Sequence, residues 1–172
     1  VIKNDISFFI YEPGDLNKAV KAAQKVKKKA QIHLELETGM NRTGLDDDNL
    51  RRTLNIIEDY KQHIRVYGAC THFAGAESIA NHVRIKRQII NFNRQLTRIQ
   101  KAGFDPEIIH MASSAGAISY PRTRKDLIRT GILQYGFWPS FETRIAFMQK
   151  YKLTVDPLHR VLSWKSRVMH IK

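Results

Sequence analysis

The 172-residue sequence has a single cysteine and no long apolar run. Cys70 cannot form an internal disulfide, so the sequence lacks the mark of a disulfide-stabilised secreted domain, and a reducing cytoplasm fits it best. No apolar run approaches the roughly 20 residues that a membrane-spanning helix needs, so no membrane association is expected. The sequence begins at Val1 without an initiating methionine or a signal segment, and we expect its natural start to lie upstream.

The sequence also lacks the common motifs for metal, nucleotide and nucleophile sites. Its seven histidines are scattered without HExxH spacing, and CxxC pairs are absent, so no metal site is expected. It has no GxSxG elbow, no GxGxxG turn and no GxxxxGKS/T loop. None of these site classes is therefore indicated.

Acidic residues are scarce in the second half, and the formal net charge is +13. Basic surfaces attract phosphate, so a nucleic-acid-binding domain is one class to weigh. Residues 87–172 carry 15 Lys and Arg against 5 Asp and Glu, but these are not interleaved with aromatic residues as a stacking platform requires. Solvated lysine-rich faces are the favoured interpretation. The nucleic-acid-binding class stays open, and it predicts salt-sensitive binding to unrelated duplexes.

Apolar runs alternate with amphipathic segments along most of the chain. Five runs have the length and composition of buried strands: residues 6–11, 31–38, 64–73, 108–112 and 127–135. Helical spacing of apolar residues separates the first four, beginning with Leu16, Ala19, Val20, Ala23 and Val26. Strict βαβα order predicts a parallel sheet covered by helices. The pattern alone does not choose between an open doubly wound sheet and a closed barrel.

The rhythm of the sequence changes after Ser140. A helix is expected over residues 141–152, and an alternating run over 161–172 has the pattern of a strand of another architecture. We therefore expect an α/β domain over 1–140, a connecting helix and linker over 141–160, and the start of a β domain over 161–172.

Polar residues follow the expected strands at their carboxyl ends, where parallel α/β folds bind ligands. The segments are Thr38–Gly44, Thr71–Ala74, His110–Gly116 and Arg129–Ile132. Their glycine amides, serine hydroxyls and arginines suit an anionic ligand. Each residue also has an inert explanation, as a structural histidine, a surface arginine or a turn, so no single one decides.

Four motifs in this order resemble those of the alanine racemase family. HLELETGMNRTG (33–44) is similar to the family's D-T-G-M-x-R-x-G segment, and ACTHFAGAES (69–78) to its T-H-F-A motif. HMASSAGAISYP (110–121) is similar to N-S-A-G, and DLIRTGILQYGFWPS (126–140) to R-P-G-I-x-x-Y-G. The final run, VLSWKSRVMHIK, resembles the first strand of the family's C-terminal β domain.

The resemblance implies an α/β fold, a partial (β/α)8 TIM-like barrel of about five βα units plus the first strand of that β domain. It implies pyridoxal 5′-phosphate as cofactor and an amino-acid substrate. The full-length protein would interconvert L-alanine and D-alanine, supplying D-alanine for peptidoglycan, as a cytoplasmic homodimer.

The resemblance also implies residue roles. Arg129 would hydrogen-bond the pyridine nitrogen, with His72 supporting it, and Arg42 would face the ring's phenolic oxygen and the substrate carboxylate, beside Met40. Ser114 and the amides of Gly131 and Ile132 would hold the cofactor phosphate, and Ser113 is also expected among the cofactor-binding residues, with Arg42, His72 and Arg129. Because an arginine does not readily yield a proton, the ring nitrogen would stay unprotonated and the ring would be a weaker electron sink.

The two bases that the family uses are not found in the sequence. The lysine that forms the aldimine would lie before Val1, and the partner's tyrosine after Lys172, so the chain alone is expected to be inactive. Three positions depart from the family pattern. Glu35 stands where many members have a carbamate-bearing lysine, and we expect it to supply the negative charge directly. Thr130 replaces a proline and Ser113 an asparagine.

Other functions within the same fold stay open. A serine or broad-specificity racemase is one, because pocket walls come partly from segments outside the sequence. A non-catalytic cofactor-binding relative and a pyridoxal-phosphate decarboxylase are others. The absence of a triple-glycine phosphate loop speaks against the decarboxylase.

Overall fold

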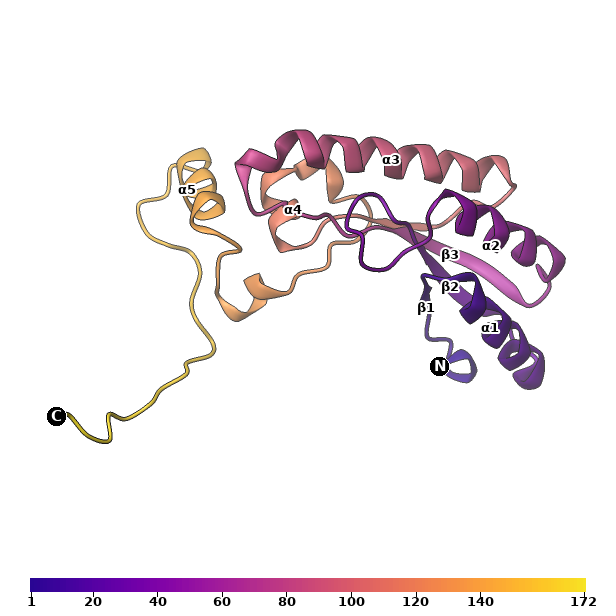
Figure 1. The fold of residues 1–172 in the computed structure, drawn as a ribbon, viewed down its shortest axis with the longest axis horizontal. Coiled ribbons are helices and arrows are strands. Elements are labelled where there is room, and N and C mark those ends of the chain that lie inside the picture. Colours follow the sequence, from indigo (N-terminus) through magenta and orange to yellow (C-terminus); the bar gives the residue numbers. More distant parts are fainter.

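The computed structural model describes residues 1–172 and is built on a four-stranded parallel sheet (Figure 1). The strands are β1 (Phe8–Ile10), β2 (Ala30–Glu35), β3 (Ile64–Cys70) and β4 (Ile108–His110), in the spatial order β1-β2-β3-β4. Strand order follows sequence order without the reversal that marks a doubly wound sheet. This is the wall of a barrel, which answers the question that the sequence pattern left open.

Three helices form the covering layer: α1 (Pro13–Val26), α2 (Asp47–Asp59) and α3 (His82–Lys101). Their starts follow from local chemistry. Pro13 occupies the first turn of α1, where its missing N–H costs nothing, and Asp46 caps α2 by accepting a 2.8 Å hydrogen bond from the Asn49 amide. The apolar stripe predicted for α1 is buried except at its end, where Val26 is exposed.

The hydrophobic core lies between these helices and one face of the sheet. Its largest fully buried side chains include Leu16, Ile32, Leu34, Leu50, Ile85, Phe92 and Ile99. Side chains alternate along a strand, so the neighbours of Ile32 and Leu34 in β2 point to the other face. That face carries the rings of Phe9, His33, Tyr67 and His110, which contact one another. The helix-free face of the sheet is thus aromatic and polar.

The strand expected over 127–135 is reduced to one isolated bridge, between Ser113 and Arg129. Pairing stops there because Gly131, with ψ of −91°, takes the backbone out of the extended conformation. The chain then forms a 3-10 helix over Ile132–Tyr135. The sheet therefore has four strands and not five.

Beyond β4 come a short helix, α4 (Ser114–Ser119), and the expected connecting helix, α5 (Phe141–Lys150), which begins with a capping box on Ser140. Residues 156–172 form neither helix nor strand and run away from the sheet (Figure 1). The strand expected over 161–172 is absent here because no second strand lies alongside to pair with it. None of the helices has the length and apolar character needed to cross a membrane.

Candidate functional site

The carboxyl ends of β2, β3 and β4 meet in a network of short polar contacts. The hydroxyls of Thr38 and Thr71 lie 2.7 Å apart, and the Thr71 amide donates to the carbonyl of His110 at 3.3 Å. Both threonines are buried. These contacts join the three strand ends into one rim.

Arg129 lies at this rim and donates only to neutral acceptors. Its Nη1 contacts the Nδ1 atom of His110 and donates to the His110 carbonyl at 3.2 Å, while Nη2 donates to the Thr71 carbonyl at 2.6 Å. Its Nε makes no hydrogen bond, and no carboxylate lies within ion-pair distance. The guanidinium therefore has no ion-pair partner and keeps two free N–H donors, one on Nε and one on Nη2.

The imidazole of His110 is held in its neutral form. Burial, with the positive charge of Arg129 and the neighbouring His33, lowers its pKa to about 3. Its Nε2 atom lies 2.9 Å from Nδ1 of His33, and both rings are buried. His110 thus occupies the supporting position beside Arg129 that the family resemblance assigned to His72.

His72 lies close to the rim but makes no hydrogen bond. Burial lowers the pKa of its imidazole, and the positive charges of Arg129 and Arg42 lower it further. Arg129 donates to the carbonyl of Thr71, the residue before His72, but no hydrogen bond joins His72 to Arg129. His110 could have been noticed in the sequence, since it ends an expected strand and opens the HMASSAG segment. The pattern does not indicate, however, that its imidazole contacts Arg129.

The residues expected to bind phosphate gather where α4 begins. Ser114 is buried, and its Oγ accepts a 2.9 Å hydrogen bond from the Gly131 amide. Ser113 pairs with Arg129 through the backbone, and its hydroxyl makes no hydrogen bond. Gly131 is exposed, with no atom within 4 Å of the place where a Cβ would lie. Ile132 follows it at the start of the 3-10 helix.

Arg42 and Met40 lie in the loop between β2 and α2. Arg42 is exposed and forms neither hydrogen bond nor ion pair. The loop itself is closed by the carboxylate of Glu37, which accepts from the amides of Gly39 and Asn41. Glu35, expected to supply a negative charge directly, accepts a 2.8 Å hydrogen bond from the Thr43 hydroxyl. Burial lowers the pKa of Arg129, and the charge of Glu35 acts to raise it.

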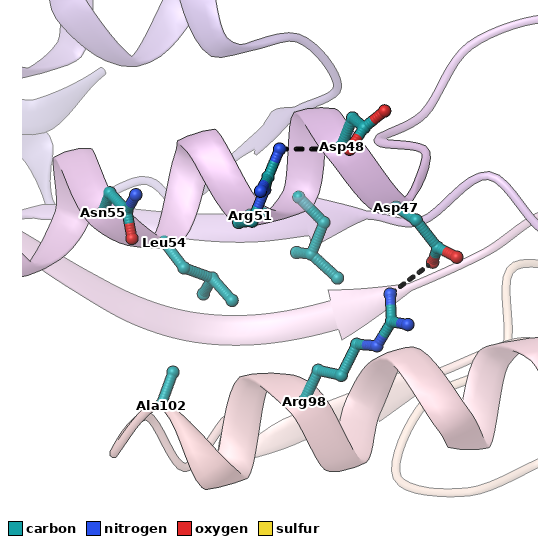
Figure 2. Close-up of a pocket in the computed structure, with 8 residues that line it drawn as sticks. Asp47, Asp48, Arg51, Leu54, Asn55, Arg98 and Ala102 are labelled. Atoms are coloured by element: carbon teal, nitrogen blue, oxygen red, sulfur yellow. Dashed lines mark hydrogen bonds and ion pairs between the residues drawn. The ribbon is translucent and has the colours of Figure 1, made fainter.

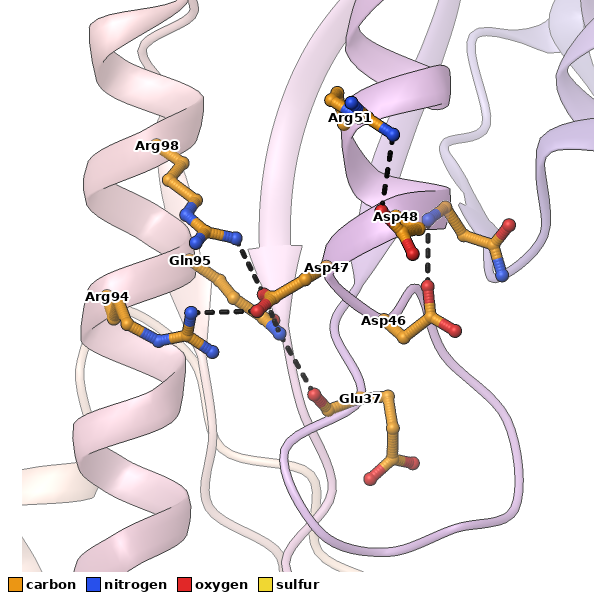
Figure 3. A network of polar contacts seen from close by, with 9 residues as sticks. Glu37, Asp46, Asp47, Asp48, Arg51, Arg94, Gln95 and Arg98 are labelled. Atoms are coloured by element: carbon orange, nitrogen blue, oxygen red, sulfur yellow. Dashed lines mark hydrogen bonds and ion pairs between the residues drawn. The ribbon is translucent and has the colours of Figure 1, made fainter.

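Helix α3 fixes this loop from outside (Figure 3). Gln95 donates to the Glu37 carbonyl at 3.1 Å and lies 3.4 Å from the Asp47 carboxylate. Asp47, in turn, pairs with Arg94 and Arg98 at 2.8 Å each. The loop that carries Arg42 is therefore tied to a helix that packs on the core.

A separate groove of about 470 Å³ runs between α2 and α3 (Figure 2). It is lined by Asp47, Asp48, Leu50, Arg51, Leu54, Asn55, Arg98 and Ala102. None of these residues belongs to the strand-end rim. The groove lies in the helical layer, and its charged walls are engaged with each other through Asp47–Arg98 and Asp48–Arg51 pairs.

The chain matches a known protein family over most of its length. Residues 1–139 match the model of the alanine racemase N-terminal domain. The chain belongs to the alanine racemase family. An alanine racemase of Leptospira interrogans serogroup Icterohaemorrhagiae is 33% identical over 142 residues, which cover 83% of this chain and 36% of that protein.

Solved alanine racemases share the fold. The enzyme from a D-cycloserine-producing Streptomyces lavendulae aligns with a TM-score of 0.78 and 30% identity over 83% of this chain and 37% of its own. The Bartonella henselae alanine racemase, with covalently bound pyridoxal phosphate, aligns with a TM-score of 0.67 at 23% identity, over 80% of this chain and 36% of its own. The chain thus spans little more than a third of these alanine racemases.

Proposed function

We propose that the full-length protein is an alanine racemase that interconverts L-alanine and D-alanine with pyridoxal 5′-phosphate. The observation that carries the proposal is Arg129, which lies at the strand-end rim with only neutral partners and a free Nε. Family membership gives this arginine its context. The product would supply D-alanine for peptidoglycan, in the cytoplasm.

The residues at the rim fit the proposed cofactor. An unprotonated pyridine nitrogen accepts a hydrogen bond from one donor, and a phosphate accepts hydrogen bonds from several. The chain offers the Nε of Arg129 for the first. For the second it offers the hydroxyls of Ser113 and Ser114 and the amide of Ile132, with the Gly131 amide available once it releases its hydrogen bond to Ser114 Oγ. No carboxylate hydrogen-bonds to any of these groups, so nothing in the set would repel a phosphate.

Each residue would act in a defined way. Arg129 would hold the ring nitrogen by donation without giving up its proton, because a guanidinium stays charged. Arg42, exposed on its tethered loop, would receive the substrate carboxylate, with Met40 beside it. Bound pyridoxal phosphate would supply an electron sink for the α-carbon, weakened by the unprotonated nitrogen. A weaker sink favours return of a proton to the α-carbon over other outcomes.

The two bases belong, in this proposal, to other parts of the full-length protein. A lysine upstream would work one face of the α-carbon, and a tyrosine from the partner's β domain the other. The proposed assembly is therefore a homodimer. Residues 1–140 would form its barrel part, 141–160 the connection, and 161–172 the first strand of the β domain.

Racemisation by the purified full-length protein tests the proposal. With pyridoxal phosphate, it is expected to develop the cofactor's yellow absorption and to convert L-alanine to D-alanine, with L-serine measured in parallel as the alternative substrate. Arg129→Glu should retain the cofactor but divert product to side reactions, because a carboxylate stabilises a protonated ring nitrogen.

The matched control is Arg122→Glu, the same change at an exposed arginine in the 3-10 helix Pro121–Thr123. It should leave the reaction outcome unchanged. A full-length protein that neither binds pyridoxal phosphate nor racemises any small amino acid would refute the proposed function.

A further inference from the structure

A line of polar groups continues inward from Arg129 across the helix-free face of the sheet. His110 Nδ1 faces Arg129, His110 Nε2 lies 2.9 Å from His33 Nδ1, and His33 Nε2 lies 3.2 Å from the hydroxyl of Ser7. The four residues come from four separate segments of the chain, and the two histidines are 8% and 2% exposed. Neither ring has a carboxylate hydrogen-bonded to it.

The chemistry of the first donor fixes every proton along this line. A guanidinium can only donate, so Nδ1 of His110 must accept and carry no proton. The proton of neutral His110 then sits on Nε2 and is donated to Nδ1 of His33. His33 must in turn carry its proton on Nε2, which donates to Ser7. A proton added to either ring would bring two donors face to face.

The surroundings preserve this arrangement. Phe9 and Tyr67 contact the His33 ring at centroid distances of 5.7 and 5.5 Å, in edge-on geometry. Gly68 lies against the same ring, and the register between β2 and β3 shifts between Ile32 and His33. An apolar cage of this kind penalises a charged imidazole, in keeping with the lowered pKa values of both histidines.

We propose that His33, with Ser7 behind it, is a positioning residue: it accepts the Nε2 proton of His110, stabilises the tautomer that Arg129 requires, and so holds Arg129 with its Nε toward the rim. His33 accepts the only proton of His110, which leaves a bare nitrogen for Arg129. The arginine is then fixed by neutral groups and keeps its full charge for the ligand. The catalytic role of His33 rests on the proposed function, whereas the hydrogen-bond pattern is independent of it.

The tautomers can be measured without cofactor. In the full-length protein labelled with nitrogen-15 at histidine, long-range proton–nitrogen spectra near neutral pH should show both His33 and His110 neutral and protonated at Nε2. Ser7→Ala should move the His33 signals and leave the His110 tautomer unchanged. A proton on Nδ1 of either ring, or a charged ring, would refute the proposed hydrogen-bond line from Arg129 to Ser7, whether or not the protein is a racemase.

Variants of His33 test its effect on catalysis. His33→Leu removes the acceptor for His110, and His33→Asn can return an amide oxygen to the place of Nδ1. In the loaded enzyme, His33→Leu should lower kcat by about tenfold or more with little change in KM, since a small displacement of a catalytic group has effects of this size, and His33→Asn should recover most of the loss. His82→Leu, at an exposed position, is the control.

The outcomes separate the two proposals. One outcome is that the full-length protein with pyridoxal phosphate fails to racemise alanine while the spectra show both histidines protonated at Nε2. In that case the proposed function is refuted and the hydrogen-bond line from Arg129 to Ser7 is retained. If His33→Leu keeps the wild-type kcat, or if His33→Asn loses as much as His33→Leu at equal thermal stability, His33 does not position Arg129.

Discussion

Gly68 in β3 lies directly against the imidazole of His33 in β2, so closely that a Cβ on the glycine would overlap the ring. The glycine is needed for this approach and not for an unusual backbone angle, since its φ lies outside the left-handed region. We expect Gly68→Ala to force the ring or the strand aside and to lower the free energy of unfolding by about 1–3 kcal/mol. Urea unfolding measures it.

Gly14 provides the control for this change. It lies in the first turn of α1, and no atom comes within 4 Å of the point that an added Cβ would occupy. Gly14→Ala should be neutral or stabilising by up to about 1 kcal/mol, because alanine favours a helix. Equal stability of Gly68→Ala and the wild type, with unchanged histidine tautomers, would mean that the close approach does not constrain the sheet.

The buried histidines should make the protein less stable in mild acid. Burial lowers the pKa of His110 to about 3 and also lowers that of His33, whereas an unfolded histidine titrates near 6.5. Between these values the unfolded chain binds protons that the folded chain does not. Stability is therefore complete above about pH 6.5 and falls as the pH drops toward 3.

The window from about pH 7 to pH 5 isolates the histidines, because carboxylates titrate lower. We expect the free energy of unfolding to fall there by at least about 1 kcal/mol, equivalent to one unit of pKa difference. His82→Gln removes an exposed histidine and should keep the slope. A wild-type protein whose stability is flat across this window would contradict neutral, buried rings.

The sequence predicts α1, α2, α3, α5 and the first four strands because their signals are local, whereas it does not predict the short helix α4. The stripe of α1 and the cap of α2 by Asp46 depend on neighbouring residues alone. The prediction of a strand over 127–135 is wrong because it used only the local apolar composition. A strand also needs a neighbouring segment to pair with, and the local sequence does not report that pairing. Pairing ends after one bridge, at Arg129.

The candidate site was only partly predictable. The order of strand-end motifs identified Arg129 and Ser114, which the structure places near each other through Gly131 and the Ser113 bridge. The partners of Arg129 were missed. In the sequence, His33 is one polar residue in an alternating strand, and it looks the same whether its face is exposed or covered by His110, 77 residues away.

The single thiol should be unreactive in the folded protein. Cys70 is 3% exposed, and burial raises its pKa to about 12, with the charge of Glu35 adding to the effect and that of Arg129 opposing it. The thiolate is the reactive form, so both access and ionisation protect it. A disulfide reagent at about pH 8 should label the unfolded chain at once and the folded chain only through opening. Rapid stoichiometric labelling of folded protein would contradict this burial.

The tether between α3 and the Arg42 loop should depend on Gln95 more than on Asp47, although Asp47 carries the ion pairs. Gln95 is 2% exposed, and Gln95→Leu leaves the Glu37 carbonyl without its 3.1 Å donor. That loss costs about 1–3 kcal/mol, partly offset because the buried Oε1 of Gln95 has no partner to lose. We expect a net loss of about 1 kcal/mol, independent of salt.

Asp47→Asn is the matched change on the ionic side of the tether. The Asp47 side chain is 44% exposed, and Arg94 and Arg98, which lower its pKa, are exposed to a similar degree. Exposed pairs contribute about 0–1 kcal/mol and are screened by salt. Urea unfolding at low and high salt measures both variants. Asp47→Asn should lower the free energy of unfolding slightly at low salt and not at high salt, whereas the loss in Gln95→Leu should be the same at both. The reverse ranking would place the strength of the tether in its charges, and Arg42 would then be positioned mainly by electrostatics that salt could release.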